Sequence, residues 1–315
     1  MKENNERADW NLSDAIWTGS PKSKPVLDDI SVVIPTLGRP ILEQSLYHIL
    51  EGSAWPACLI VVDQGTNTDV ADWLESVRQT GISVKHIRSS QRGRSAGINR
   101  GLEQVATPFV AITDDDCFVG EEWLINMAHR LRLSPRAVVT GRVEAAGESM
   151  IIVVTSPTPS TQNRPRLKFD SMSGGNMGAS LESFRKVGLF EEDPVMATAE
   201  DAEWAYRALR KGISICYEPR VMVSHFGWRD VGKRVEQYRD YALSHGGFYG
   251  KYLRRGDLFI LARSFIHLVR SFKRWVYGKI VRDSENTLNG KAYFLGLVPG
   301  IIAGFRSRHK TGKLL

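Results

Sequence analysis

Short apolar runs alternate with segments of helical periodicity through residues 30–133, and this alternation constrains the fold more than any other feature of the chain. The runs are rich in β-branched residues, as strands are, and they cover 30–35, 59–63, 82–87 and 109–113. The segments that follow them repeat apolar residues at helical intervals, and they cover 41–51, 70–78, 94–105 and 121–133. A strand followed by a helix, repeated four times, predicts an α/β fold with a mostly parallel central sheet.

The pattern changes after residue 137. We expect strands at 138–143 and 151–154, helices at 181–187 and 199–211, and two short strands at 213–217 and 221–224. The Pro-, Ser- and Thr-rich segment 156–166 is predicted to be a loop. Residues 1–29 are polar, without the apolar stretch of a signal peptide, and we expect them to form a partly ordered lead-in. The predicted domain therefore covers residues 30–226.

The net charge of +7 is unevenly distributed along the chain. Residues 1–225 carry 24 basic and 29 acidic side chains, whereas residues 226–315 carry 18 basic and 6 acidic ones. A basic tail on a mildly acidic domain indicates a separate role for the tail, and nucleic acid and anionic membranes are the usual partners. A hydrophobic content of 42% excludes a disordered chain. The three cysteines form no CxxC pair, which excludes a disulfide scaffold and indicates a reducing compartment.

The basic tail, residues 227–315, is predicted to be helical and to lie on a membrane. Residues 258–281 carry two opposite stripes, a basic one formed by Arg263, His267, Arg270 and Arg274 and an apolar one formed by Phe265, Val269, Phe272 and Val276. Residues 292–305 are uncharged but shorter than the roughly 20 residues of a spanning helix, so we expect the tail to lie on a membrane surface rather than to cross it. The alternative is that its apolar faces pack on the domain or on a partner subunit. Because the aromatic side chains lie near the apolar stripe, nucleic acid is not an expected partner.

Three carboxylates, Asp114, Asp115 and Asp116, follow directly after the predicted strand 109–113. Adjacent carboxylates repel one another, and the carboxyl ends of parallel strands are where α/β sheets bind ligands. Hard oxygen ligands at this position favour Mg²⁺ or Mn²⁺ bridged to a phosphate. Asp63 ends an earlier strand, where it either accepts hydrogen bonds from a ribose or a base or is an ordinary turn residue.

Four further segments contain residues that are typical of ligand sites. Residues 92–101 (RGRSAGINRG) open a helix, whose N-terminus attracts phosphate, although a solvated basic face would give the same pattern. Residues 174–178 (GGNMG) either let the backbone approach a ligand closely or form an ordinary turn. Glu200 and Asp201 begin a helix, either as residues that favour its N-terminal dipole or with one of them as a general base. His225 ends a strand and is either structural or a metal ligand.

Taken together, six segments resemble the family 2 glycosyltransferases, which have the GT-A fold, a Rossmann-like sheet flanked by helices. The matching segments are SVVIPTLGRP (31–40), LIVVDQGTNTD (59–69), RGRSAGINRGLEQV (92–105), FVAITDDDC (109–117), SGGNMGASLESFRKVGLFEE (173–192) and AEDAEWAYRALRKGISICYEPRVMVSH (199–225). Their order and spacing are specific for the family, and they do not specify the sugar.

The resemblance implies an inverting, metal-dependent transfer of a sugar from a nucleotide-diphosphate sugar. Asp201 matches the catalytic base of the family, and Asp115, Asp116 and His225 match positions that hold Mn²⁺ or Mg²⁺. The implied contacts of the donor are Pro35, Thr36, Arg39, Asp63, Gln64, Arg94, Asn99, Asp114, Asp115, Gly175 and Asn176. The implied contacts of the acceptor are Glu200, Trp204 and Arg207.

Gln64 departs from the family pattern, because many members have a second acidic residue there that contacts uracil. Since Gln64 can still hydrogen-bond a base, we expect a UDP-sugar donor, with dTDP and GDP sugars as alternatives. The tail resembles that of members that build cell-surface polysaccharides, which implies a glycan or polyprenyl-diphosphate-linked acceptor and a cytoplasmic protein on the membrane surface, either monomeric or oligomeric. A non-catalytic nucleotide-sugar-binding scaffold and a nucleotidyltransferase are the alternative functions, and the four aspartates at 114–116 and 201 favour the transferase.

Overall fold

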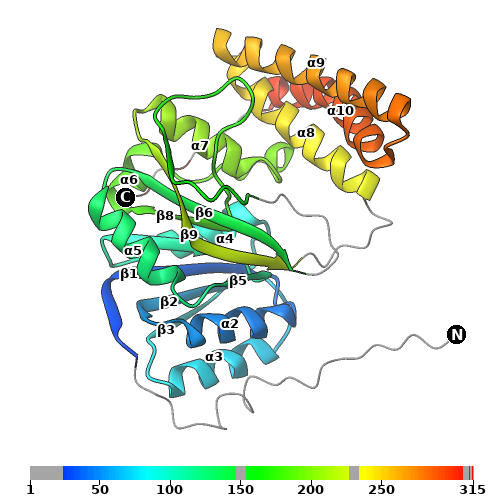
Figure 1. Cartoon of the computed structure of the whole chain (residues 1–315). Coiled ribbons are helices and arrows are strands. Elements are labelled where there is room, and N and C mark those ends of the chain that lie inside the picture. Colours follow the sequence, from blue (N-terminus) through cyan, green and yellow to red (C-terminus); the bar gives the residue numbers. More distant parts are fainter. Residues whose placement is uncertain (1–23, 147–153, 227–233, 308–311, 313, 315) are drawn as a thin grey trace, which may run out of the picture.

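The computed structural model describes residues 24–146, 154–226, 234–307, 312 and 314. One nine-stranded sheet with the order β3-β2-β1-β4-β8-β6-β9-β5 runs through the molecule, and β7 pairs with β9 (Figure 1). The strands are β1 (Val26–Thr36), β2 (Trp55–Asp63), β3 (Val84–Arg88), β4 (Phe109–Thr113), β5 (Cys117–Val119), β6 (Val138–Ala146), β7 (Ser160–Gln162), β8 (Asn176–Ser180) and β9 (Ile215–Phe226). The predicted α/β fold is confirmed.

The sheet changes direction at β8. Strands β1 to β4 are parallel, with β1 between β2 and β4. Strand β8 is antiparallel to both β4 and β6, and its first residue, Asn176, lies opposite Thr113 at the end of β4. The segment before β8 therefore lies beside the three aspartates that follow β4.

Helices cover both faces of the sheet, and alternate residues of each central strand bury against different layers. On β1, Val32 and Ile34 face one layer and Val33 faces the other. The first layer contains α2 (Ile41–Glu51), α3 (Asp69–Gln79) and α5 (Trp123–Leu133). The second contains α4 (Arg94–Leu102), α6 (Leu181–Val187) and α7 (Glu200–Arg210). Strands buried on both faces are apolar throughout, which explains the continuous apolar runs of the sequence.

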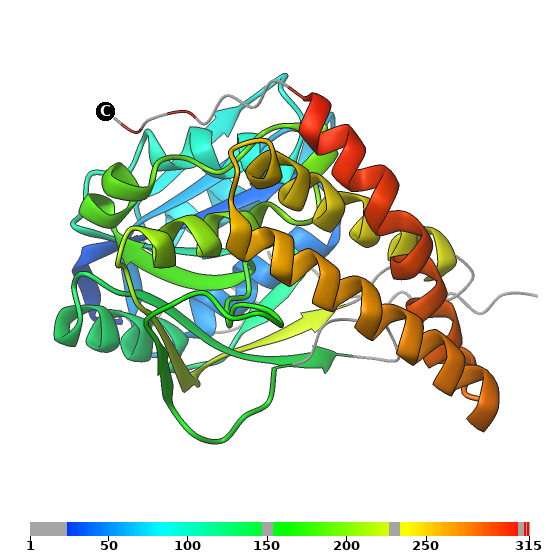
Figure 2. The same cartoon turned by 90° about the horizontal axis from the view of Figure 1, so that it is seen from above.

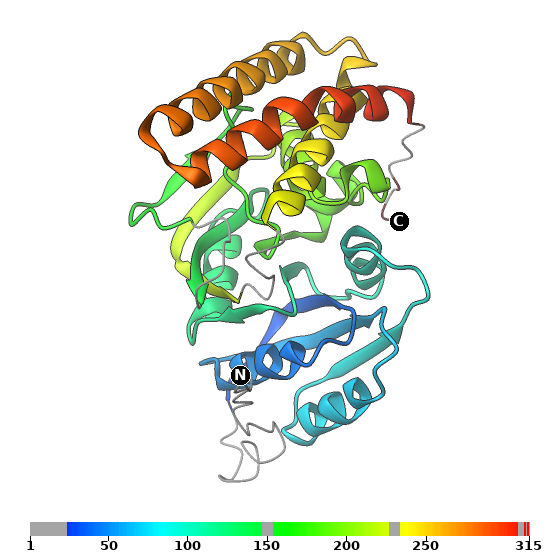
Figure 3. The ribbon, with the colours of Figure 1, turned by 90° about the vertical axis from the view of Figure 1, so that its right-hand side faces the viewer.

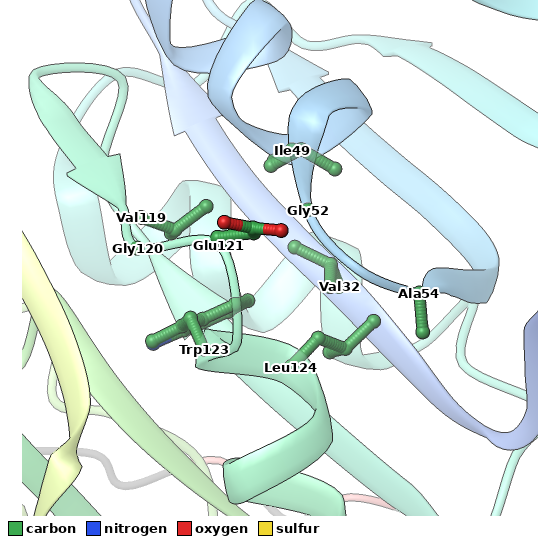
Figure 4. A pocket seen from close by; sticks show the side chains of 9 residues that line it. All are labelled: Val32, Ile49, Gly52, Ala54, Val119, Gly120, Glu121, Trp123 and Leu124. Atoms are coloured by element: carbon green, nitrogen blue, oxygen red, sulfur yellow. The ribbon is translucent and has the colours of Figure 1, made fainter. Parts of the chain in front are cut away.

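A small cavity of about 10 Å³ lies in the first layer, between the end of α2 and the start of α5 (Figure 4). Its walls are mostly apolar and include Val32, Ile49 and Trp123. It has about the volume that one water molecule needs, which excludes it as a substrate site.

Three C-terminal helices form a further layer at one end of the molecule (Figures 1 and 3). They are α8 (Arg234–Leu253), α9 (Leu258–Val281) and α10 (Ser284–Arg306), and α10 packs against both of the others (Figure 2). Helix α8 joins the domain through an apolar cluster that includes Tyr206 of α7, Phe248 of α8 and Met196 of the short helix η1 (Pro194–Met196). Helix α10 approaches α8 closely, because a Cβ atom at Gly300 or Gly304 would lie 2.2 or 2.1 Å from an α8 carbonyl oxygen.

Helix α9 turns the first part of its basic stripe inward and its apolar stripe outward, while Arg274 at the end of the basic stripe is exposed. Arg263 is 2% exposed and donates to Asp170 at 2.6 Å, and His267 is 8% exposed. Phe265 and Phe272 of the opposite stripe are 66% and 46% exposed. The expected alternative, in which the apolar faces of the tail pack on the domain, therefore does not describe the apolar stripe of α9. Within the described residues, α10 is the single helix whose length and apolarity suffice to cross a membrane.

Most predicted elements are present. Helices 41–51, 181–187 and 258–281 and strand 109–113 have the predicted bounds. Strands β5, β7 and β8 were not predicted, and β7 lies in the segment expected to be a loop. Helix α8 lies in the tail that was predicted to be helical, but its bounds were not predicted. The two short strands expected at 213–217 and 221–224 are one strand, β9. Residues 1–23 of the lead-in and 151–153 of the expected strand lie outside the described residues.

Candidate active site

A cavity of about 1040 Å³ opens at the carboxyl ends of β1 and β4 and extends beneath the C-terminal helices. This volume is at the upper end of the range for small-molecule sites, so it has room for a donor and part of an acceptor. Twelve residues implied by the resemblance line it: Pro35, Thr36, Arg39, Gln64, Arg94, Asp114, Asp115, Asp116, Gly175, Glu200, Asp201 and His225. The structure therefore brings most of the predicted site together.

Asp115 and Asp116 lie against Arg39 in the floor of the cavity. Arg39 forms ion pairs with both carboxylates, and its Nη2 atom lies 3.0 Å from Asp116 Oδ2. Thr36, the last residue of β1, donates its hydroxyl to Asp115 Oδ2 at 2.6 Å. Burial raises the pKa of Asp115, although Arg39 and Thr36 oppose the effect. A guanidinium group thus holds together two carboxylates that would otherwise repel each other.

His225 reaches the aspartate cluster because β5 pairs antiparallel with β9. This pairing sets Cys117 opposite His225, and His225 Nε2 lies 3.4 Å from Asp116 Oδ1. Burial alone would raise the pKa of Asp116, but the hydrogen bond to His225 and the charges of His225 and Arg39 lower it to about 2. Asp116 is therefore ionised at neutral pH.

The donor set around Asp116 fits a divalent cation. Ligand atoms of Asp116, Cys117 and His225 lie within 4.8 Å of one another. Burial raises the pKa of the Cys117 thiol well above its usual value, and Mn²⁺ and Mg²⁺ prefer oxygen ligands to sulfur, so Cys117 is not an expected ligand. The remaining carboxylate and imidazole suit Mn²⁺ or Mg²⁺, and Asp115 lies beside them.

Arg94 links the aspartate cluster to the start of α7. Its Nε atom donates to Asp114 Oδ1 at 2.7 Å and its Nη1 atom to Glu200 Oε1 at 2.9 Å. Within the described residues, Arg94 Nη2 and Glu200 Oε2 are buried without a hydrogen-bond partner. Burial raises the pKa of Glu200 to about 7, with the charge of Asp201 adding to the effect and Arg94 opposing it. These unsatisfied atoms are suited to a polar ligand.

Asp201 lies in the first turn of α7, across the cavity from β1. Its Oδ2 atom accepts a hydrogen bond from Gly174 N at 3.2 Å, and Oδ1 accepts one from Ala202 N at 2.7 Å. Both partners are neutral backbone amides, and Asp201 lines the cavity. A carboxylate held in this way can accept a proton from a bound hydroxyl group.

Glycines bring the segment before β8 into contact with both clusters. A Cβ atom on Gly175 would lie 2.6 Å from Asp114 Oδ2, and one on Gly174 would lie 3.0 Å from Asp201 Cβ. This packing requires glycine because the backbone approaches other side chains of the site, and its approach to a ligand stays a prediction. In residues 92–101, Gly97 serves a different purpose, because its Cβ atom would lie 2.7 Å from Pro35 Cβ and would separate α4 from the sheet.

Three predicted donor contacts, Asp63, Asn99 and Asn176, do not line the cavity. The carboxylate of Asp63 is fully buried and pairs with Arg88 and His86 of β3. Asn99 donates to Phe190 O at 2.9 Å and tethers α4 to the chain after α6. Asn176, the third, is fully buried; it accepts from Trp123 Nε1 and donates to two backbone carbonyls.

The two predicted acceptor contacts of α7 also lie away from the cavity. Trp204 is fully buried in the second layer and donates to Gly188 O at 2.8 Å. Arg207 pairs with Glu203 at 2.8 Å and donates to two backbone carbonyls. Only the first turn of α7 reaches the cavity, because the rest of the helix is enclosed between the sheet and α8.

The resemblance did not indicate the part of the cavity formed by the C-terminal helices. This part includes His245 and Tyr249 of α8, His267 and Arg270 of α9, and Tyr293 of α10. The basic stripe of 258–281 was a visible signal for it, but the sequence did not show that the stripe faces inward.

Comparisons with known proteins agree with this geometry. The family described as "Glycosyl transferase family 2" matches residues 31–188, half of the chain. No curated protein sequence matches significantly. The solved structure of S. aureus TarS is 14% identical with a TM-score of 0.55, and the alignment covers 84% of this chain but only 55% of the TarS chain.

Two further solved structures have a similar fold. A mannosyltransferase from Pyrobaculum calidifontis, PcManGT, in complex with GDP-Man and Mn²⁺, is 14% identical with a TM-score of 0.60, covering 91% of this chain and 88% of that one. GalNAc-T7 with UDP, GalNAc and Mn²⁺ is 16% identical with a TM-score of 0.53, covering 71% of this chain and 50% of that one. The chain belongs to glycosyl transferase family 2 and has the GT-A fold of that family.

Proposed function

We propose that the protein transfers a sugar from a nucleotide-diphosphate sugar, with UDP as the nucleotide, to a hydroxyl group of an acceptor with inversion at the anomeric carbon. The observation that carries the proposal is that one cavity contains both the Asp114–Asp116 cluster and the carboxylate of Asp201. A scaffold that only binds nucleotide sugars has no chemical need for Asp201 there. Complexes of TarS with UDP and of PcManGT with GDP-Man support a nucleotide donor for this fold.

The donor is assigned to the side of the cavity formed by the ends of β1 and β4. Thr36 and Gln64 supply polar groups for the nucleoside, and Arg39 and Arg94 supply positive charge for the diphosphate. Asp116 and His225, with Asp115 beside them, would hold Mn²⁺ or Mg²⁺, as in the neighbours solved with Mn²⁺. A bound divalent cation would neutralise charge on the diphosphate leaving group.

Asp201 is assigned as the general base. It takes the proton of the acceptor hydroxyl as the oxygen attacks the anomeric carbon, and the bond from that carbon to the diphosphate oxygen breaks on the opposite face. The nucleoside diphosphate leaves, and no covalent enzyme intermediate forms. One carboxylate is therefore sufficient, unlike the pair that glycoside hydrolysis requires.

The acceptor is proposed to be a glycan or a lipid-linked glycan. The reaction is proposed to take place at the cytoplasmic membrane surface. The outward apolar stripe of α9 supports this location, because exposed Phe265, Val269, Phe272 and Val276 give an apolar face to a helix at the surface. The basic excess of the tail complements anionic lipid, to which each nearby basic residue adds about 1 kcal/mol of attraction. The apolar stripe of α9 is therefore proposed to contact lipid.

Replacing the base tests the mechanism. Asp201→Asn should lower turnover by about 10²- to 10⁴-fold, the usual contribution of a general base, while UDP still raises the melting temperature in Mn²⁺. Release of nucleoside diphosphate from a panel of nucleotide sugars, with free and lipid-linked glycan acceptors, measures turnover. Asp72→Asn on the exposed side of α3 is the matched control. Unchanged turnover in Asp201→Asn would remove this residue from the role of base.

A further inference from the structure

The cavity continues past Asp201 into a region that we call the distal lobe, formed by the C-terminal helices. Its lining side chains are Arg234, Gln237, Tyr238, Tyr241, His245, Tyr249, Arg263, His267, Arg270, Ser271, Arg274, Asn289 and Tyr293. Four of these are arginines and none is acidic. The distal lobe is thus basic, whereas the region around β4 is acidic.

Two of the four arginines are neutralised by carboxylates. Arg263 Nη1 lies 2.6 Å from Asp170 Oδ2, and Arg234 Nη1 lies 3.3 Å from Glu285 Oε2. These pairs fasten α9 to the segment after β7 and α8 to α10. They account for the acidic groups that contact the basic lining.

Neither of the other two arginines forms an ion pair with a carboxylate among the described residues, although the charge of Arg274 acts on Asp283. Arg274 donates to the neutral amides of Asn286 at 2.5 Å and Asn289 at 2.7 Å. Arg270 is partly buried and has no hydrogen bond or ion pair within the described chain. The two residues are four apart on α9 and therefore lie on the same face of the helix. Both residues line the distal lobe, Arg270 as a partly buried side chain and Arg274 as an exposed one.

Among the described residues, no acidic side chain is one of the groups that act most strongly on Arg270. Burial, together with the nearby Arg263 and Arg274, lowers the pKa of Arg270 from its usual value. Burial and the neighbouring His245 and arginines lower the pKa of His267 to about 2, so this imidazole is neutral and accepts or donates only a hydrogen bond with Tyr249, at 2.9 Å. Partly buried charge without a partner is costly, and an anion in the distal lobe would remove that cost.

The position of the distal lobe identifies which substrate would enter it. Asp201 stands between the donor side of the cavity and the distal lobe, close enough to His245 for its charge to act on that imidazole. A molecule that places its hydroxyl group on Asp201 from the side opposite the donor must occupy the distal lobe. This molecule is the acceptor, on the assignment of Asp201 proposed above.

We propose that the distal lobe binds a phosphate or diphosphate group of the acceptor through Arg270 and Arg274. Two adjacent guanidinium groups match the charge and the several oxygens of such a group better than the single charge of a carboxylate. Rings of Tyr249, His267 and Tyr293 line the same lobe, and Tyr293 lies with its ring centroid 5.0 Å from that of His267. These rings give the sugar next to the phosphate a surface to pack against.

The test measures anion binding by the full-length protein without nucleotide or divalent cation. Inorganic pyrophosphate is titrated in EDTA, and Arg270→Gln/Arg274→Gln should weaken its binding about tenfold or more. Lys273→Gln, on the same helix but outside the lining of the cavity, should leave binding unchanged. Equal affinity of the wild type and the double variant, or no binding by the wild type, would overturn the proposal. Arg270→Lys/Arg274→Lys should recover part of the affinity.

Two further measurements separate the sources and the hypotheses. The first compares farnesyl diphosphate with pyrophosphate. Tighter binding of farnesyl diphosphate that is weakened in the double variant indicates a lipid-linked acceptor. Equal affinity of the two probes indicates a water-soluble acceptor. The double variant loses the hydrogen bonds of Arg274 to Asn286 and Asn289 but no ion pair, so its melting temperature should fall only slightly. UDP binding in Mn²⁺ should survive in the double variant. A wild type that binds pyrophosphate in the distal lobe but no nucleotide sugar would refute the proposed function alone.

Discussion

A buried lysine connects the C-terminal helices to the domain, and removing it should destabilise the whole protein. Lys251 of α8 is completely buried, and its Nζ atom lies 2.7 Å from Glu191 Oε2 and 2.8 Å from Glu203 Oε1. Glu203 also accepts from Arg207 and from Tyr252 Oη, the latter at 2.7 Å. Lys251→Met keeps the length of the side chain and leaves two buried carboxylates without their shared cation.

The size of the effect follows from the ionisation of Glu203. Burial alone would raise its pKa, but the charges of Arg207 and Lys251 lower it from 4.5 to about 2. The gap corresponds to roughly 3 kcal/mol, which Arg207 and Lys251 supply together, since one pKa unit is about 1.4 kcal/mol. Removing one partner of a buried ion pair usually costs about 3–5 kcal/mol. We therefore expect Lys251→Met to lower the free energy of unfolding by about 3 kcal/mol at pH 7.

The pH dependence has a defined sign. Because the pKa of Glu203 is lower in the folded state, its ion pairs stabilise the fold fully above pH 4.5, and the stabilisation is lost as the pH falls toward 2. In Lys251→Met this contribution is smaller, so the difference in unfolding free energy between wild type and variant should shrink over the same interval.

Urea unfolding followed by circular dichroism at pH 7 and at pH 4 and below measures both effects. Lys273→Met on the exposed side of α9 is the matched control and should change the free energy of unfolding by less than about 0.5 kcal/mol. A loss below about 1 kcal/mol in Lys251→Met, or a loss equal to that of the control, would show that the lysine does not hold the two parts together.

Two other outcomes are expected. Chelation by EDTA should stop sugar transfer, and Mn²⁺ or Mg²⁺ should restore it. Asp116→Asn should need at least about tenfold more metal for this, because a charged ligand is lost. Full activity in EDTA would exclude the metal site. Phe265→Ser/Phe272→Ser should reduce flotation of the protein with anionic vesicles about tenfold or more, because burying each exposed ring in lipid is worth about 1.5–3 kcal/mol. Phe169→Ser, an exposed control outside α9, should leave flotation unchanged. Unchanged flotation of the double variant would exclude the apolar stripe as the lipid contact.

Local sequence patterns were sufficient for the elements whose packing follows from their own periodicity. Strand β4 and helix α9 have the predicted bounds, because the apolar run of β4 and the two stripes of α9 are visible within each segment alone. Strand β8 was missed because NMGAS contains a glycine and two polar residues, yet all five residues are buried, and a Cβ atom on Gly178 would lie 2.6 Å from Met127 Sδ. Helix α8 contains Gly246, Gly247 and Gly250, which lower helix propensity but admit α10 and η1. In both segments tertiary packing overrides the local structural preference of the sequence.

The candidate site was predictable where residues follow the ends of parallel strands. Asp114, Asp115 and Asp116 line the cavity because β4 ends at Thr113, a position that the sequence shows directly. Which side chains of a segment face the cavity and which face the core was not predictable. Gly175 faces the cavity while the next residue, Asn176, begins a strand and turns its amide into the core. Adjacent residues of an extended chain point to opposite sides, and a motif does not state which side is buried.

The orientation of α9 joins the two proposals about the acceptor. A helix on the surface of a water-soluble protein turns its apolar stripe to the core, but α9 places Arg270 at the cavity and leaves Phe272 exposed. This arrangement costs stability in water, because an apolar stripe is solvated while cations are partly desolvated. An acceptor with an anionic group beside an apolar chain offsets both costs at once, since the anion enters the distal lobe and lipid covers the outer stripe. A soluble phosphorylated acceptor offsets only the first. The difference in affinity between farnesyl diphosphate and pyrophosphate therefore measures whether the two faces of α9 serve one substrate.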